Sequence, residues 1–258
     1  MPRIIDNINL GLEQVLSESL MDSHSLDAAV GYFNLRGWKV IAEQIESLTG
    51  DEKRAPVRLL IGMQQQAPST EFRELMRLNV AHKNMDNATA IKLNEITSNE
   101  FRQQLAIGIP SGVDEKYLKK LRDQLSTGKV RVRHFLNYNL HAKLYICHRN
   151  DAVSPRVGIV GSSNLTFAGL SNQGELNVDV LDHDATEKLN KWFEERWNDK
   201  YSIDVTDLLV TIIDESWANQ ELLNPYLIHL KIAYHLSRDA RAGLVEYGLP
   251  DSIQRQLL

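Results

Sequence analysis

The 258-residue sequence predicts an α/β fold: a mixed β-sheet sandwiched between helices and followed by a helical C-terminal extension. Up to about residue 82, stretches with a helical period of apolar residues alternate with compact apolar runs, which is typical of units that build parallel strands. Between residues 129 and 181, four strand-like segments follow one another closely, as antiparallel strands do. Hydrophobic residues make up 43% of the chain, which is enough for a packed core and excludes disorder as the overall state.

The pattern places the elements in a definite order. Helices are predicted at residues 8–20, 37–48, 69–82, 114–125 and 185–197, and strands at residues 26–33, 57–61, 129–135, 142–148, 156–161 and 175–181. After residue 200 the pattern is helical, at residues 205–218 and 225–240 and from residue 252. Residues 1–200 are therefore predicted to form the main domain, and residues 201–258 an extension or a linker toward a further domain.

Composition narrows the class of protein. No run of about 18 apolar residues occurs, and the first residues lack the basic and apolar regions of a secretory signal, so we expect a protein that neither spans a membrane nor is secreted by that route. The single cysteine, Cys147, excludes an internal disulfide framework and favours the cytoplasm. Because His134, Cys147 and His148 match no zinc spacing, no metal and no cofactor are predicted.

Charge is distributed unevenly along the chain. The net charge of -5 argues against a general nucleic-acid coat. Residues 129–156, however, carry six basic residues and one acid, or +5, whereas residues 182–221 carry 11 acids and four basic residues, or -7. We therefore expect an anionic ligand at the first of these two segments.

Four polar side chains are expected to lie close together, near the start of the strand at 142–148 and just after the strand at 156–161. His141 and Lys143 share one face of the strand at 142–148, because strand side chains alternate with period two, and the opposite face is expected to be core. Ser162 and Asn164 emerge at the turn after the next strand. An ammonium, a hydroxyl, a carboxamide and an imidazole together suit a phosphoryl group, with His141 as nucleophile or proton carrier.

These residues resemble the signature of the phospholipase D superfamily, H-x-K followed by D and then by G-S-x-N on the next strand. The blocks 141–143 and 161–164 match it residue for residue. The resemblance implies a metal-independent phosphodiesterase in which His141 attacks phosphorus to form a phosphohistidine and a second histidine protonates the leaving oxygen. Lys143, Ser162 and Asn164 would hold the phosphoryl oxygens as charge builds in the transition state.

The chain departs from that signature in two ways. His148 stands where the aspartate should follow Cys147, and the 18 positions between Lys143 and Gly161 make a longer interval than the signature has. The missing aspartate is similar to nuclease members of the superfamily in which an acid beyond G-S-x-N supports the site. Glu175 has that place here, and the resemblance implies that it orients the imidazole of His141.

The implied mechanism needs two histidines, yet only one complete motif exists. His229 and Lys231 also have the H-x-K spacing, but they lie in a helical pattern with no G-S-x-N after them, so we interpret this match as coincidence. A single-motif chain would then pair with a copy of itself and place both His141 side chains about a two-fold axis. Homodimerisation is therefore predicted.

Other residues have weaker patterns. Tyr32 and Asn34 end an early strand and are candidates for the edge of the site, whereas Tyr145 is expected to serve packing. Arg131 and Arg133 alternate on one strand face, which fits either a phosphate-binding track or an edge strand protected by charge.

We expect a DNA endonuclease that functions in restriction, defence or DNA processing. The alternatives are a phospholipase or transphosphatidylase of the same superfamily, and a catalytically weak DNA-binding module of a helicase. Residues 226–234 look like the linker found where such nuclease domains precede a helicase motor, so a C-terminal helicase or ATPase domain is a predicted partner. No G-x-x-x-x-G-K-[ST] loop occurs in the sequence itself, so no nucleotide site of that class is predicted.

Overall fold

The computed structural model describes residues 2–51, 54–62, 87–107, 109–219 and 233. All elements discussed below belong to one compact unit, Met1–Asn219. The helical segments predicted at residues 69–82 and from residue 252 lie outside the described residues, as does the segment at 225–240 apart from Ala233.

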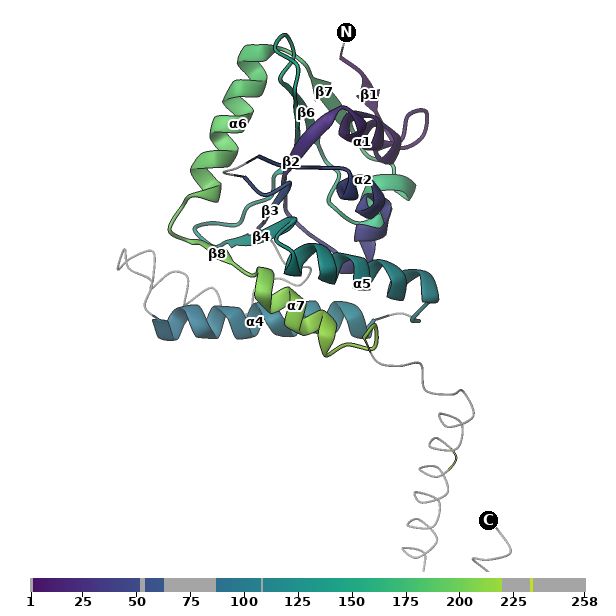
Figure 1. The fold of residues 1–258 in the computed structure, drawn as a ribbon, viewed down its shortest axis with the longest axis vertical. Coiled ribbons are helices and arrows are strands. Elements are labelled where there is room, and N and C mark those ends of the chain that lie inside the picture. The colour runs from purple at the N-terminus through teal and green to yellow at the C-terminus, as the bar shows by residue number, and fades with distance from the viewer. Residues whose placement is uncertain (1, 52–53, 63–86, 108, 220–232, 234–258) are drawn as a thin grey trace, which may run out of the picture. The chain divides into compact units, whose positions relative to one another are not determined.

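An eight-stranded mixed sheet forms the centre of this unit (Figure 1). The strands are β1 (Ile4–Ile5), β2 (Ser23–Val30), β3 (Val57–Ile61), β4 (Val130–Phe135), β5 (Lys143–Arg149), β6 (Arg156–Gly161), β7 (Asn177–Val180) and β8 (Ser202–Asp204). Their order across the sheet is β1-β7-β6-β5-β2-β3-β4-β8. Strands β2, β3 and β4 are parallel and all other pairs are antiparallel, so the predicted mixed sheet is confirmed.

Helices cover both faces of the sheet. The helical elements are α1 (Leu12–Met21), the 3-10 helix η1 (Leu35–Val40), α2 (Ala42–Glu46), α4 (Asn87–Ala106), α5 (Gly112–Ser126), the π-helical turn η2 (Ala168–Asn172), α6 (His183–Trp197) and α7 (Thr206–Asp214). Helix α6 packs on β4, β5 and β6, whereas α1, α5 and α7 pack around the other face. Side chains cap the N-termini of α5 and α6. Ser111 accepts a hydrogen bond from the Asp114 N–H, and Asp182 accepts one from the Ala185 N–H.

Both faces of β5 are buried, and Tyr145, which shares a face with Lys143, is 1% exposed. Tyr145 and Cys147 belong to the larger core cluster, while Leu144 and Ile146 pack with Phe193 of α6. Since the sheet lies between two helical layers, its alternating side chains supply two cores rather than a core and a solvent face. Only the first residue of β5 and the residues before it lie at the end of the strand, beyond the two cores.

The compact unit extends beyond the predicted boundary at residue 200. Strand β8 pairs with β4, and α7 packs against α5 and α4. Leu209, Ile212 and Ile213 of α7 are each no more than 1% exposed, so this helix is part of the core. Residues 201–219 therefore complete the domain rather than begin an extension.

Candidate active site

The predicted site residues come together where three interior strands, β2, β5 and β6, have neighbouring ends. The last residue of β2, Val30, pairs with Lys143 at the start of β5, and Leu144 pairs with Val160 near the end of β6. The ends of β2 and β6 therefore lie beside the start of β5. This register places His141, just before β5, next to the turn that follows β6.

His141 and Lys143 are in direct contact. The Nζ atom of Lys143 lies 2.7 Å from Nε2 of His141 and donates a second hydrogen bond, 3.1 Å long, to the His141 carbonyl oxygen. A lysine ammonium can only donate, so Nε2 is the acceptor and the imidazole proton is assigned to Nδ1. The lone pair of Nε2 therefore faces the cation on which a phosphoryl oxygen would bind.

Burial and charge act in opposite directions on Lys143. Lys143 is only 6% exposed, and this burial lowers the pKa of its ammonium below the ordinary value. The carboxylate of Glu175 raises that pKa and offsets part of the effect. Glu175 therefore helps to keep Lys143 protonated, as an anion-binding role requires.

Glu175 lies in the site, but its hydrogen bond goes to a different residue from the one expected. The Ser162 hydroxyl donates to Oε2 of Glu175 and accepts a hydrogen bond of 3.0 Å from the Leu176 N–H. Among the contacts of the described residues, none joins Glu175 to the imidazole of His141. The carboxylate thus orients Ser162 and acts on Lys143 through space.

One hydrogen bond holds the carboxamide of Asn164 by its oxygen. The backbone N–H of Tyr32 donates to Oδ1 of Asn164 over 2.8 Å. Because a backbone N–H cannot accept, the oxygen is identified and the NH₂ group of the carboxamide must point elsewhere. In the described part of the chain this NH₂ group has no acceptor, so Asn164 presents two donors to a ligand.

Two glycines, one at the end of β2 and one at the end of β6, make this packing possible. A Cβ on Gly31 would lie 3.3 Å from Cδ2 of His141 and 3.4 Å from Oδ1 of Asn164, so this glycine lets the end of β2 approach both site residues. A Cβ on Gly161 would come within 2.3 Å of Asn177, so the turn after β6 admits only glycine. The signal for Gly31 was its place directly before Tyr32 at a strand end.

A pocket of about 600 Å³ adjoins the site. Tyr32 and Asn34, the two weaker candidates, line it together with Asn164 and Glu175. The pocket also contains Lys39, whose ammonium lies 4.7 Å from the ring centre of Phe167 and is paired with Asp114, as well as Arg36. Tyr32 is half-buried, and this burial raises the pKa of its hydroxyl.

The residue that replaces the signature aspartate lies away from the site. His148 is five residues beyond Lys143, which corresponds to about 16 Å along a strand and to the opposite face of the sheet. Its Nε2 lies 2.7 Å from Oδ2 of Asp27, and Arg58 holds the same carboxylate with two hydrogen bonds. These partners lower the pKa of the buried Asp27 carboxyl to about 2. Position 148 therefore belongs to a buried ionic cluster in this chain.

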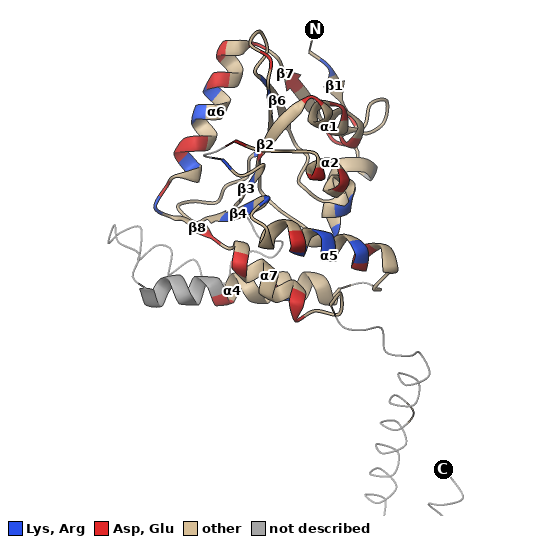
Figure 2. Ribbon diagram, viewed as in Figure 1, with Lys and Arg blue, Asp and Glu red and all other residues tan. Residues whose placement is uncertain are grey.

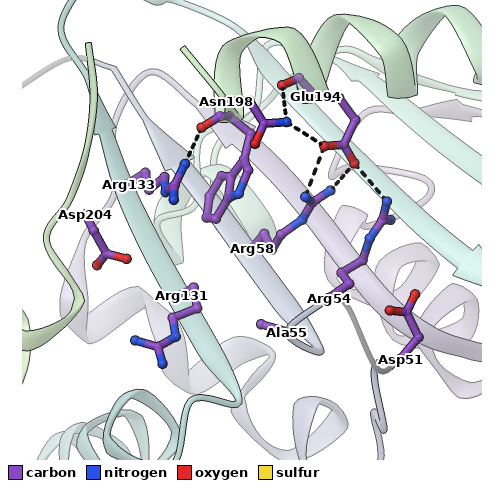
Figure 3. A pocket seen from close by; sticks show the side chains of 10 residues that line it. Asp51, Arg54, Ala55, Arg58, Arg131, Arg133, Glu194, Asn198 and Asp204 are labelled. Carbon is purple, nitrogen blue, oxygen red and sulfur yellow. Dashed lines mark hydrogen bonds and ion pairs between the residues drawn. The ribbon is translucent and has the colours of Figure 1, made fainter. Parts of the chain in front are cut away.

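Arg131 and Arg133 are not brought to the site. They face α6 and line a different pocket (Figure 3). By strand spacing, both Cα atoms are about 15 Å or more from that of Lys143. The interpretation of an edge strand protected by charge is wrong, because β8 pairs with β4 and makes it an interior strand.

Ion pairs explain part of the charge asymmetry along the sequence. Arg156, in the basic segment, pairs with Glu187 of the acidic segment on α6, and Lys129 pairs with Glu46. Figure 2 shows acidic and basic residues interspersed along α6. The six basic residues of segment 129–156 therefore do not form one cationic surface.

No second histidine joins His141 at the site within the described part of the chain. His134 lies three strands away from Lys143 in register, or about 14 Å, and its Nδ1 is 3.1 Å from the Thr97 hydroxyl. Complete burial lowers the pKa of His134 to about 4. Across the described residues, no cluster of three or more His, Cys, Asp or Glu could hold a metal ion, and no helix has the length and apolar character to cross a membrane.

Sequence comparison places the chain in a family. A family model described as the PLD-like domain of cardiolipin synthase matches residues 20–197, which is more than half of the chain and includes the whole site. The chain belongs to the PLD-like family. No curated protein sequence matches this PLD-like chain.

Solved structures of low sequence identity are similar to parts of this chain. NucT from Helicobacter pylori is 12% identical with a TM-score of 0.41, and Nuc from Salmonella typhimurium, a phospholipase D family member, is 16% identical with a TM-score of 0.41. Each comparison covers 79% of this chain and 98% of the other. Phosphatidylserine synthase from Haemophilus influenzae is 15% identical with a TM-score of 0.44, over 95% of this chain and 46% of the other.

Proposed function

We propose that this PLD-like chain is a metal-independent phosphodiesterase that cleaves DNA as an endonuclease through a phosphohistidine at His141. The observation that carries the proposal is the 2.7 Å contact between Lys143 Nζ and His141 Nε2. This contact supports the proposal, because a nucleophilic lone pair on His141 and an oxyanion-binding cation on Lys143 would then be within reach of one phosphorus atom.

The reaction has two steps that mirror each other. In the first, Nε2 of His141 forms a bond to phosphorus, the bond from phosphorus to the leaving sugar oxygen breaks, and a second histidine gives that oxygen a proton. In the second, water attacks phosphorus, the nitrogen–phosphorus bond breaks, and the second histidine takes the proton of the water. Lys143 and the Asn164 NH₂ group stabilise the charge that develops on the phosphoryl oxygens. Ser162 joins them once its hydroxyl turns from Glu175 to the substrate.

The second histidine is proposed to be His141 of a partner subunit in a homodimer. Two observations support this arrangement. The described part of the chain brings no other histidine to the site, and exposed apolar side chains surround it: Ile8 is 80% exposed, Phe167 44% and Leu176 64%. Glu175 donates a backbone hydrogen bond to Asp6, so the loop that carries Ile8 adjoins the site. A two-fold interface would cover these side chains.

Cations beside the site favour DNA as the substrate. Arg36 lines the pocket that contains Asn164 and Glu175, where the phosphates next to the scissile one would lie. Lys39 lines it too and would have to exchange its ion pair with Asp114 for a phosphate. Functions in restriction, defence or DNA processing, a cytoplasmic location, and continuation into a helicase or ATPase domain are further parts of the proposal.

A phospholipid-cleaving or phosphatidyl-transferring activity is the second candidate, because the matching family model is described by cardiolipin synthase. The same site chemistry would serve either phosphodiester. A catalytically weak DNA-binding module is the third, and it predicts binding of DNA without cleavage.

One experiment separates these candidates. The protein and its His141→Ala variant are incubated in EDTA with plasmid DNA and, separately, with phospholipid vesicles. We expect cleavage of plasmid alone, lost in the variant, together with a ³²P-labelled protein adduct that is stable to alkali and labile to acid. Cleavage of phospholipid alone would select the second candidate, and cleavage of neither the third. A strictly monomeric, active protein in solution would contradict the dimer.

A further inference from the structure

A second polar pocket, with a volume of about 840 Å³, lies on the α6 face of the sheet (Figure 3). Four arginines line it, two from β3 and the segment before it and two from β4: Arg54, Arg58, Arg131 and Arg133. It lies on the opposite face of the sheet from Lys143, and the proposed function does not use it.

The two arginines of the β3 side are paired with acids. Arg58 holds Asp27 through Nε and Nη2, at 2.7 and 2.8 Å, and also donates to Glu194. Arg54 donates to Asp27 and to Glu194 at 3.1 and 2.8 Å. These charges are largely compensated, and the pairs hold this wall of the pocket in place.

The two arginines of β4 have no acidic partner within ion-pair distance among the described residues. Arg133 donates through Nη1 to the Trp197 carbonyl oxygen, its guanidinium lies 4.7 Å from the Trp197 ring centre, and its Nε is buried without an acceptor. Arg131 is exposed and has no hydrogen bond from its guanidinium to another described residue. Since they are two residues apart on one strand, their Cα atoms are about 6.6 Å apart and their side chains share a face.

The acids that line this pocket limit the size of the ligand. Asp204 stands opposite Arg133 in the β4–β8 register and accepts a hydrogen bond from the Thr206 N–H, while Asp51 lies on the far side near Arg54. The lining has four arginines and three acids, and the buried Asp27 behind it pairs with Arg54 and Arg58, so the charges around the pocket nearly balance. Such a balance suits a single oxyanion that accepts hydrogen bonds from two guanidinium groups, rather than a long track of phosphates.

We propose that Arg131 and Arg133 bind one phosphate group at a site separate from the catalytic one. The phosphate would belong either to a nucleic-acid backbone that runs past the α6 face or to a free nucleotide. Both present the planar oxygen pair that a guanidinium fork recognises. This inference goes beyond the proposed function, since it holds whether or not the chain cleaves DNA.

Titration calorimetry on the Lys143→Ala background tests the proposal, because that change removes the cation of the catalytic site. The probes are inorganic phosphate, adenosine monophosphate and a single-stranded 12-nucleotide DNA. We expect Arg131→Gln to weaken binding about tenfold, as the loss of a charged hydrogen bond predicts. Arg133→Lys, which keeps the charge but loses the fork, should also weaken it. Lys188→Gln is the matched control, because Lys188 is an exposed cation elsewhere on α6.

Binding of all three probes with dependence on Arg131 would identify a small phosphate ligand, and dependence for the oligonucleotide alone would identify a nucleic-acid backbone. In the second case the salt dependence of binding should also fall by about one phosphate contact. Equal losses in Arg131→Gln and Lys188→Gln, or no binding of any probe, would overturn the proposal. Failure of the proposed function would show instead as absent cleavage with this binding intact.

Discussion

The two ends of β5 differ in how their polar groups are satisfied. At the first end, His141 is exposed. Among the described residues, the NH₂ group of Asn164 has no acceptor, and the Lys143 ammonium hydrogen-bonds only to His141. At the other end, His148 joins Asp27, whose carboxylate accepts four hydrogen bonds and is fully buried. Groups that the fold leaves with free donors are available to a ligand, whereas saturated groups stabilise the fold.

This difference explains how the chain can lack the signature aspartate. Position 148 lies on the opposite face from Lys143 and about 16 Å further along the strand. Its side chain contributes to the attachment of α6 through Asp27, Arg58 and Glu194. Position 148 therefore takes part in the packing of α6 on the sheet and lies apart from the candidate site.

Removing the proposed nucleophile, His141, tests the exposed end of β5 and should have the largest effect. We expect His141→Ala to lower the single-turnover rate of DNA cleavage by about 10⁴-fold or more, because the covalent step is lost. The melting temperature should stay unchanged, since His141 is exposed. His183→Ala, an exposed histidine at the start of α6, is the control and should keep full activity. Comparable residual rates in the two variants would show that His141 is not the nucleophile.

A change at the His148 end of β5, where the polar groups are fully hydrogen-bonded, should lower the stability and leave the cleavage rate nearly unchanged. Asp27→Asn removes a buried charge from between Arg58, Arg54 and His148, and we expect it to lower the free energy of unfolding by about 3 kcal/mol. Urea denaturation measures this loss. The cleavage rate per folded molecule should remain close to that of the parent protein. A loss of rate without a loss of stability would place Asp27 in the chemistry and remove the contrast between the two ends.

The sequence predicted the strands that carry the two ends of β5 better than the elements around them. Strand 57–61 and the residues at the ends of β5 and β6 follow from apolar periodicity, because that signal is local. Strands β1 and β8 have two and three residues, too few to show alternation, and α4 was not predicted at all.

Contacts between distant segments were beyond the sequence pattern. Asp27 interrupts an apolar run, and only the register with β3 and β5 brings Arg58 and His148 to it. The position of Arg131 and Arg133 depends on the order of strands in the sheet, which one sequence does not specify. Gly31 likewise gains its meaning from His141, more than a hundred residues later in the chain.

A buried histidine outside both ends should make stability depend on pH. The pKa of His134 is lowered to about 4, from 6.5 in an exposed histidine, because the ring is buried. Below pH 6.5 the unfolded chain therefore binds a proton that the folded chain does not, so stability falls as the pH falls toward 4. The contribution of His134 to this loss is about 3 kcal/mol. Urea denaturation at pH 7.5 and pH 4.5 measures it, and in His134→Gln the difference between the two values should shrink. An unchanged difference would assign the pH dependence to other groups.

The smallest effect concerns Glu175, an acid at the exposed end of β5. Glu175 raises the pKa of Lys143 against the lowering effect of burial, so Glu175→Gln should lower that pKa further. The alkaline limb of the profile of kcat/KM against pH should then move to lower pH, because Lys143 loses its proton sooner. Ser162→Ala provides the comparison, since it removes the hydroxyl that Glu175 accepts from but keeps the carboxylate. It should lower the rate and leave the alkaline limb in place. If both variants moved the limb equally, the hydrogen bond to Ser162, and not the charge of Glu175, would control the protonation of Lys143.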